Sequence, residues 1–281
     1  MFPHTDTSHP IAVAQAVEEV QREVYPGHSH ALIRQLFADV QAMFEGRYHD
    51  YQPIDLRYHD FQHTLQATLC MAELVAGRAR ASAEPALSAR EFECGIAAVA
   101  LHDTGYLKLR GDRTGSGAKY TYTHVLRSCS FAASYLPTLG FGQEELTIAL
   151  NAIGCTGPAS SLYPIAFGSP AEKIVGSCVA TADFLGQMAA PDYPDELGIL
   201  YAEFEESDDY LRVPHEARVF KSADDLIART PEFWRGHVLP KLNLSFQGVY
   251  RYLADPFPDG PNRYLEAIER NITHIQRLKR T

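Results

Sequence analysis

The sequence predicts an all-α fold, a single bundle of packed helices that extends over residues 1–281. Apolar residues recur every three or four positions along most of the chain, which is the spacing of one helix face. Alternating runs of apolar and polar β-branched residues, which would indicate half-buried strands, are scarce. No linker is long or polar enough to divide the chain, so we expect one domain.

The first half of the chain is expected to contain four helices. They span residues 11–24, 31–44, 58–75 and 91–103. Pro26-Gly27 ends the first helix, and a small-residue loop over 79–85 follows the third. The fourth is apolar almost throughout, so we expect it to be buried. The segment 105–119, rich in Gly, Asp and Lys, is expected to form a surface loop over its end.

The second half is expected to contain seven more helices, separated by segments rich in Pro, Gly or Ser. They span residues 121–136, 143–154, 171–188, 195–206, 222–229, 231–253 and 261–277. The helix over 231–253 contains Pro240, which should kink it. Acidic residues crowd the stretch 192–209 and are expected to form a solvated face or loop. The helices over 195–281 are expected to complete any pocket in the core.

Charge and cysteine usage limit the partners. Lys plus Arg is 25 and Asp plus Glu is 35, for a net charge of −10, and no long basic block is present, which argues against a nucleic-acid polymer. No apolar run approaches the roughly 20 residues of a membrane span. The five cysteines form no CxxC pair and are expected to be free thiols in a reducing, cytoplasmic compartment. The oligomeric state is left open.

A dispersed set of histidines and aspartates carries the clearest chemical signal. His59 and His63 are four residues apart and would share a helix face. His102-Asp103 ends an apolar helix, and Asp183 lies inside another. Imidazole nitrogens with carboxylate oxygens suit Fe, Mn, Zn, Ni or Co. Common nucleophile and phosphate-loop motifs are absent.

Packing alone could explain each of these residues singly. A lone histidine among apolar residues is usually a hydrogen-bonded core residue. An unpaired buried carboxylate is costly, however, and Asp103 and Asp183 would both be buried. The group as a whole therefore favours a shared metal site, although spacing alone does not establish that the helices converge.

Three segments resemble the HD-domain superfamily of metal-dependent phosphohydrolases, which includes the cyclic-nucleotide phosphodiesterases. They are Tyr-His-Asp-Phe-Gln-His-Thr at 58–64, Ala-Leu-His-Asp-Thr-Gly-Tyr at 100–106, and Ala-Asp at 182–183. The stretches beginning at His124 and continuing to Phe141, and Ala182 to Gly186, are also similar to bacterial members. The resemblance covers a motif core of roughly 58–188 and implies a helical HD/PDEase-like bundle with a metal site between its core helices.

The resemblance also implies roles for individual residues. The residues that would bind a divalent transition metal are His63, His102, Asp103 and Asp183. Asp103 would be able to bridge to a second ion, such as Mg²⁺, and His124 is a further candidate ligand. His59 matches the histidine that protonates the leaving oxygen, so His59 and Asp103 are the candidate catalytic residues.

A weaker similarity lies near the C-terminus. Gln247 and Tyr250 match a phosphodiesterase segment in which a glutamine hydrogen-bonds the nucleobase and an aromatic ring stacks on it. An ordinary amphipathic helix is the alternative. The chain departs from the phosphodiesterases in having Asp60 where they usually have Asn, and Gly105-Tyr106 where they have a further His. These departures bear on the second metal and on a cyclic-nucleotide substrate.

The expected function is therefore hydrolysis of a small phosphoester, a nucleotide or cyclic nucleotide, by metal-activated hydroxide with a histidine general acid. Two alternatives remain open. The first is an HD-type di-iron oxygenase, which would need ligands beyond the four above. The second is a non-catalytic module that binds a nucleotide.

Overall fold

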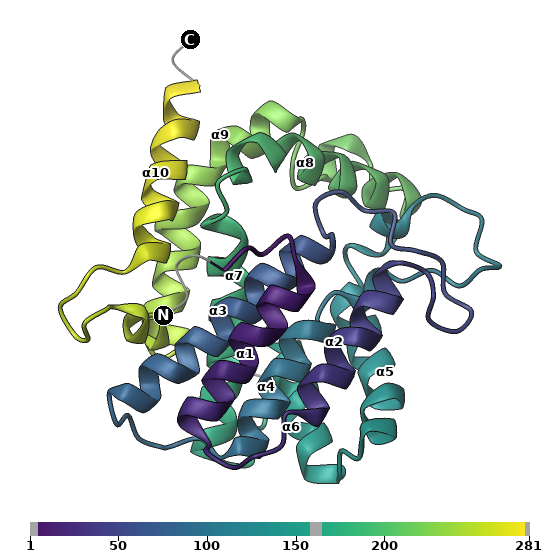
Figure 1. Ribbon diagram of the computed structural model, residues 1–281. Coiled ribbons are helices and arrows are strands. Elements are labelled where there is room, and N and C mark those ends of the chain that lie inside the picture. Colours follow the sequence, from purple (N-terminus) through teal and green to yellow (C-terminus); the bar gives the residue numbers. More distant parts are fainter. Residues whose placement is uncertain (1–4, 158–164, 279–281) are drawn as a thin grey trace.

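The expected all-α class is confirmed by the computed structural model, which describes residues 5–157 and 165–278 (Figure 1). Parts of the expected connector over 154–170 lie outside the described residues. The helices are α1 (Pro10–Val24), α2 (Ala31–Phe44), α3 (Phe61–Arg80), α4 (Ala89–Leu101), α5 (His124–Tyr135), α6 (Gln143–Gly154), α7 (Pro170–Met188), α8 (Tyr193–Tyr210), α9 (Ala223–Phe233) and α10 (Arg263–Leu278). Within the described ranges, the only β-type pairing is an isolated bridge between Tyr51 and Leu109.

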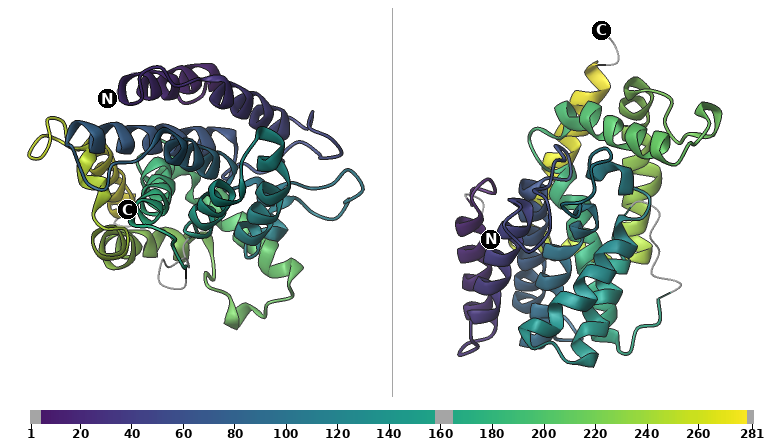
Figure 2. Two further views of the ribbon diagram at one scale, coloured as in Figure 1. Left: turned by 90° about the horizontal axis from the view of Figure 1, so that it is seen from below. Right: turned by 90° about the vertical axis from the view of Figure 1, so that its right-hand side faces the viewer.

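The helices are arranged around a buried centre formed by α3, α4 and α7. Helices α1 and α2 form an outer layer over α3 and α4, and α5 and α6 pack beside α4 (Figures 1 and 2). Helices α8 and α9 lie across one end of the bundle, where α10 contacts α7, α8 and α9. One hydrophobic cluster runs through all of these layers. None of the described helices combines the length and the apolar character that crossing a membrane requires.

Helix α3 begins three residues later than the spacing of apolar residues predicts. The Asp60 backbone is extended, and its Oδ1 accepts a hydrogen bond of 2.9 Å from the backbone N–H of His63, which makes Asp60 the N-cap. His59 therefore lies in the turn before the helix. The expectation that His59 and His63 share a helix face is wrong, because a carboxylate cap competes with helical periodicity.

The segment 105–119 is only partly the expected surface loop. Its ends form two short 3-10 helices, η1 (Thr104–Tyr106) and η2 (Gly117–Tyr120), which are mostly buried. Ser116 Oγ donates to Glu206 of α8 at 2.6 Å, and the backbone N–H of Gly117 donates to Asp55 at 2.8 Å. The ends are drawn inward by these hydrogen bonds, and only the middle of the segment is exposed.

The prediction of a single kinked helix over 231–253 is also wrong. Helical dihedral angles continue through Pro240, at φ −59° and ψ −42°, in two π-helical turns over 234–238 and 241–245. The chain then breaks at Gln247 and Gly248, whose φ angles are +57° and +65°, because two successive left-handed residues cannot continue a helix. A separate 3-10 turn, η7 (Val249–Leu253), follows.

The five cysteines are free thiols, as expected, and all but Cys129 are buried. Trp234 is buried as well, and its indole N–H donates to Glu269 of α10 at 2.7 Å. This hydrogen bond ties the end of α9 to the last helix.

Helices α3 and α7 come into close backbone contact at Gly186. A Cβ placed there would lie 2.8 Å from the backbone nitrogen of Ala67 and 2.9 Å from its Cα. Backbone atoms cannot move aside as a flexible side chain can. The small residue therefore lets the two helices meet, and these helices carry His63 and Asp183.

We expect Gly186→Ala to lower the free energy of unfolding by about 1–3 kcal/mol, because the added methyl group must push α7 away from α3. Gly198→Ala in α8 is the matched control, since no atom lies within 4 Å of its added Cβ. The control should be neutral or stabilising by up to about 1 kcal/mol. Urea unfolding measures both, and equal effects for the two variants would contradict the close approach.

Candidate metal centre

The buried centre of the bundle brings together four of the residues that the sequence singles out. His63 lies in the first turn of α3, and Asp183 lies in α7. His102 caps the C-terminus of α4 and is followed directly by Asp103. All four side chains are buried. The helices thus converge, which spacing alone could not establish.

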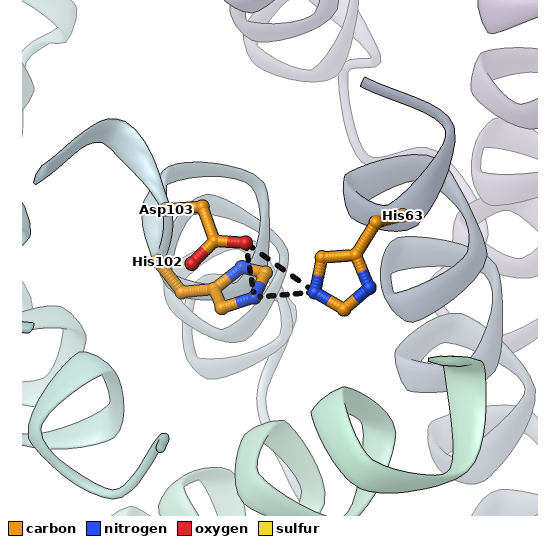
Figure 3. A group of neighbouring side chains, drawn as sticks. All are labelled: His63, His102 and Asp103. Atoms are coloured by element: carbon orange, nitrogen blue, oxygen red, sulfur yellow. Dashed lines mark hydrogen bonds and ion pairs between the residues drawn. The ribbon is translucent and has the colours of Figure 1, made fainter. Parts of the chain in front are cut away.

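The donor atoms lie close together. The Nε2 atoms of His63 and His102 are 3.3 Å apart, and Asp103 Oδ2 lies 3.3 Å from the first and 3.2 Å from the second (Figure 3). In the part of the chain that the structure describes, these are the residues whose ligand atoms gather as a possible metal site. Asp183 Oδ1 approaches the same two nitrogens, at 3.6 and 3.4 Å.

These separations suit a single ion. Ligands about 2.1 Å from a metal lie roughly 3.0–3.4 Å apart when they are neighbours in octahedral or tetrahedral geometry. The observed spacings require little movement of the side chains to reach these values. Two imidazoles and one or two carboxylates form a ligand set suited to a divalent transition metal.

Hydrogen bonds fix the orientation of the His102 ring. Its Nδ1 donates to the carbonyl of Val99 at 2.6 Å, so Nε2 is the nitrogen left to bind an ion. The turn after it is held by Ser128, whose Oγ donates to the His102 carbonyl at 2.5 Å and accepts from the Gly105 N–H at 2.8 Å. A Cβ on Gly105 would lie 1.9 Å from the carbonyl oxygen of His124, so only glycine allows α5 to start this close.

Asp103 supplies the clearest sign that a positive charge belongs here. It is 2% exposed, and its Oδ2 is buried without a hydrogen-bond partner. Burial opposes its charge, but the neighbouring imidazoles of His102 and His63 outweigh burial and hold the pKa of Asp103 well below its usual range. The pKa of Asp183 is lowered in the same way, against burial, by the same two histidines.

The pKa values of the two histidines are shifted in the opposite direction. Burial lowers the pKa of His63, but its close contacts with the carboxylates of Asp103 and Asp183 more than compensate and raise it to about 10. The pKa of His102 is also raised, because the charges of Asp103 and Asp183 outweigh burial. Without an ion, a proton on the imidazole pair thus neutralises part of the carboxylate charge.

His124, the further candidate ligand, reaches the edge of the cluster. Its Nδ1 donates to the carbonyl of Thr121 at 2.6 Å, and its Nε2 lies 3.8 Å from Asp103 Oδ1. Asp103 therefore faces two sides, with Oδ2 toward His63 and His102 and Oδ1 toward His124. Burial lowers the pKa of His124, which favours the neutral form that binds metals.

His59 is held by a residue that the sequence analysis misplaced. Glu203 was expected on a solvated face, but it is 6% exposed, and its Oε2 accepts a hydrogen bond of 2.6 Å from Nδ1 of His59. Its Oε1 accepts from the backbone N–H groups of Tyr58 and Arg57, at 2.9 and 3.2 Å. Glu203 thus orients the histidine and leaves its Nε2 available.

Tyr106 packs against both His59 and His124. Its ring centroid is 4.7 Å from each imidazole, at interplanar angles of 27° and 9°. The two imidazoles are themselves 6.2 Å apart, so the three rings form one cluster, with the tyrosine at a position where phosphodiesterases have a histidine. The tyrosine offers no imidazole to a second ion.

Gln247 and Tyr250 do not form the expected pair on one helix. Gln247 donates to Ser177 Oγ at 3.0 Å, and the Tyr250 hydroxyl donates to Asn243 at 2.9 Å. Because a left-handed turn separates them, the two side chains have different local partners. Neither residue lines the pocket beside His63, to which the C-terminal part of the chain contributes Asp192, Tyr193 and Glu196. Their role in binding a base stays a prediction.

No family model matches the chain, and no curated protein matches its sequence.

The pKa shifts predict how the metal-free protein responds to pH. His63 has a raised pKa, so its contribution to stability is complete below its unfolded pKa of about 6.5 and is lost as the pH rises toward 10. Asp103 and Asp183 have lowered pKa values, so their contribution is lost in acid, below about pH 4. We expect the free energy of unfolding, measured with urea in a chelator, to fall between pH 6.5 and 10.

His63→Gln is the control for this fall, since it removes the group that titrates. Its stability should vary less over the same pH interval. An unchanged pH dependence in the variant would contradict the assignment.

Proposed function

We propose that this chain is a metal-dependent phosphohydrolase of the HD type that acts on a small phosphoester. The observation that carries the proposal is the buried group of His63, His102 and Asp103, with an Asp103 oxygen that has no hydrogen-bond donor. Asp183 adds a second carboxylate to the same imidazole pair. The likeness of the three sequence segments to the HD superfamily supports the same assignment.

The four residues would hold a divalent transition metal, and the chain's own groups would orient the reaction around it. When bound, such an ion neutralises phosphoryl oxygens and lowers the pKa of a water molecule. Asp103 Oδ1 and His124 Nε2 offer a second place for an ion, which Mg²⁺ could take. Val99 and Gln187 orient the ligands: the Val99 carbonyl accepts from His102, and the Gln187 side chain donates to Asp183 at 3.2 Å.

His59 would act as the general acid. In its protonated form, Nδ1–H is held by Glu203, so Nε2–H is the proton available to the leaving oxygen. The Glu203 carboxylate would stabilise the positive imidazolium. This is the carboxylate–histidine arrangement that fixes a ring's orientation and keeps one nitrogen free.

The substrate class in this proposal is a small phosphorylated molecule, with a nucleotide or cyclic nucleotide as the first choice. The five free cysteines are consistent with a reducing, cytoplasmic setting. A di-iron oxygenase is a second candidate, because His124 lies near Asp103 and could serve a second iron. Oxygen uptake or a mixed-valent iron signal from native protein would favour the oxygenase over the hydrolase.

The first test is elemental analysis of native protein, followed by a phosphatase and phosphodiesterase screen in the metal found. We expect about one or two ions per chain, and we expect Asp103→Ala to lose both metal and hydrolysis. Asp224→Ala, at an exposed position of α9, should retain both. A wild-type protein that takes up no ion from a range of divalent metals would overturn the proposal.

The second test separates proton donation from metal binding. His59→Ala should keep its metal, while kcat falls by about 10²- to 10⁴-fold, the usual contribution of a general acid. Glu203→Gln should also keep the metal and lower kcat by a smaller factor. Unchanged turnover in His59→Ala would remove the histidine from the mechanism.

A further inference from the structure

A small acidic pocket lies directly beside the candidate metal centre. It is bounded by the start of α3, the end of α7 and the start of α8, and His63 forms part of its wall. Asp60, Asp192 and Glu196 also line it, together with glutamine and tyrosine side chains. No Lys or Arg is among its lining residues. A pocket of this composition disfavours a phosphate group and favours a cation or a donor of several hydrogen bonds.

Two polar groups of residues that line the pocket have no hydrogen-bond partner among the described residues. Tyr193 is 5% exposed, and its hydroxyl makes no hydrogen bond with any described residue. One carboxylate oxygen of Asp192, Oδ1, is sealed from solvent and also has no donor. Buried groups of this kind are normally hydrogen-bonded. A ligand that donates hydrogen bonds would give the Tyr193 hydroxyl, in the wall of the pocket, a partner.

The neighbouring side chains have partners of their own. The Tyr58 hydroxyl donates to Gln187 at 2.7 Å, and Gln187 in turn donates to Asp183. Burial and the nearby carboxylates of Asp192 and Asp60 raise the pKa of Glu196 to about 7. Among the lining residues, His63 is the group whose charge opposes this shift.

The volume of the pocket and the spacing of its carboxylates favour an ammonium group over a metal ion. The cavity volume is about 10 Å³, which is room for one water-sized group, and an ammonium head is of that size. The carboxylates of Asp60, Asp192 and Glu196 do not all lie within 4.8 Å of one another. The ligand atoms of His63, His102 and Asp103 do. Oxygens around Mg²⁺ are at most about 4.2 Å apart, whereas oxygens bonded to one ammonium nitrogen can be about 5.6 Å apart.

We propose that this pocket binds the ammonium group of an amine-bearing substrate whose phosphoester lies at the adjacent metal centre. The inference rests on the proposed function for the phosphoester part. Asp192 and Glu196 would accept from the ammonium N–H groups, and Tyr193 would complete the pocket. The site would thereby prefer an aminoalkyl phosphate over a neutral ester of the same size.

The test compares two esters that differ in one group, 2-aminoethyl phosphate and 2-hydroxyethyl phosphate, on metal-loaded protein. We expect a KM at least 10-fold lower for the amine, with similar kcat. In Asp192→Asn and Glu196→Gln this preference should fall below about 3-fold. Asp195→Asn is the matched control, because it removes an exposed charge from the same turn of α8, outside the pocket, and should keep the preference.

A binding experiment makes the result independent of hydrolysis. Ethylammonium is titrated into metal-loaded protein with ¹³C-labelled tyrosine, and the Tyr193 resonance is identified with Tyr193→Phe. A saturable shift of that resonance that is lost in Asp192→Asn supports the pocket even if neither ester is hydrolysed, in which case only the proposed function fails. Equal KM values for the two hydrolysed esters would overturn the inference. So would a Tyr193 resonance that responds to Mg²⁺ or Ca²⁺ but not to ethylammonium.

Discussion

The central constraint on this protein is that two carboxylates share a buried position with two imidazoles. Removing each charge from water costs several kcal/mol, and that cost is offset only when a proton or a cation lies among the four groups. The four residues come from α3, from α7 and from the C-terminal end of α4, and these helices also form the centre of the bundle. Packing the core and assembling the site are therefore one requirement, and a displacement of any of these helices would leave a charge unpaired.

Short contacts between backbone atoms determine where the packed helices place the candidate metal-binding residues. Asp60 determines where α3 begins and so which turn carries His63. Gly105 lets the start of α5 rest against the turn after Asp103, and Gly186 lets α7 touch α3. A metal tolerates errors of only a few tenths of an ångström in its ligands. Contacts between backbone atoms can keep the side chains within that tolerance, because backbone atoms lack the rotamer freedom of long side chains.

The sequence predicted the helices of the core and the four central residues, because apolar periodicity and buried acids are local signals. It failed where a tertiary contact overrides the local pattern. Glu203 stands in an acidic stretch and is like its exposed neighbours in sequence, yet it is buried because His59 and two backbone N–H groups bind it. The sequence pattern predicted that Gln247 lies in a helix. Its backbone instead adopts a left-handed conformation, which apolar periodicity does not reveal.

Helix α8 connects two features that have been described separately. Its first turns carry Asp192, Tyr193 and Glu196 of the acidic pocket, and Glu203, two turns further along, holds His59. Beyond that, Glu206 anchors the segment that follows Tyr106. A helix is stiff over this length, so a ligand that displaced the first turn of α8 would also displace Glu203 and the imidazole of His59. The acidic pocket and the hydrogen bond that orients His59 are thus coupled through one helix.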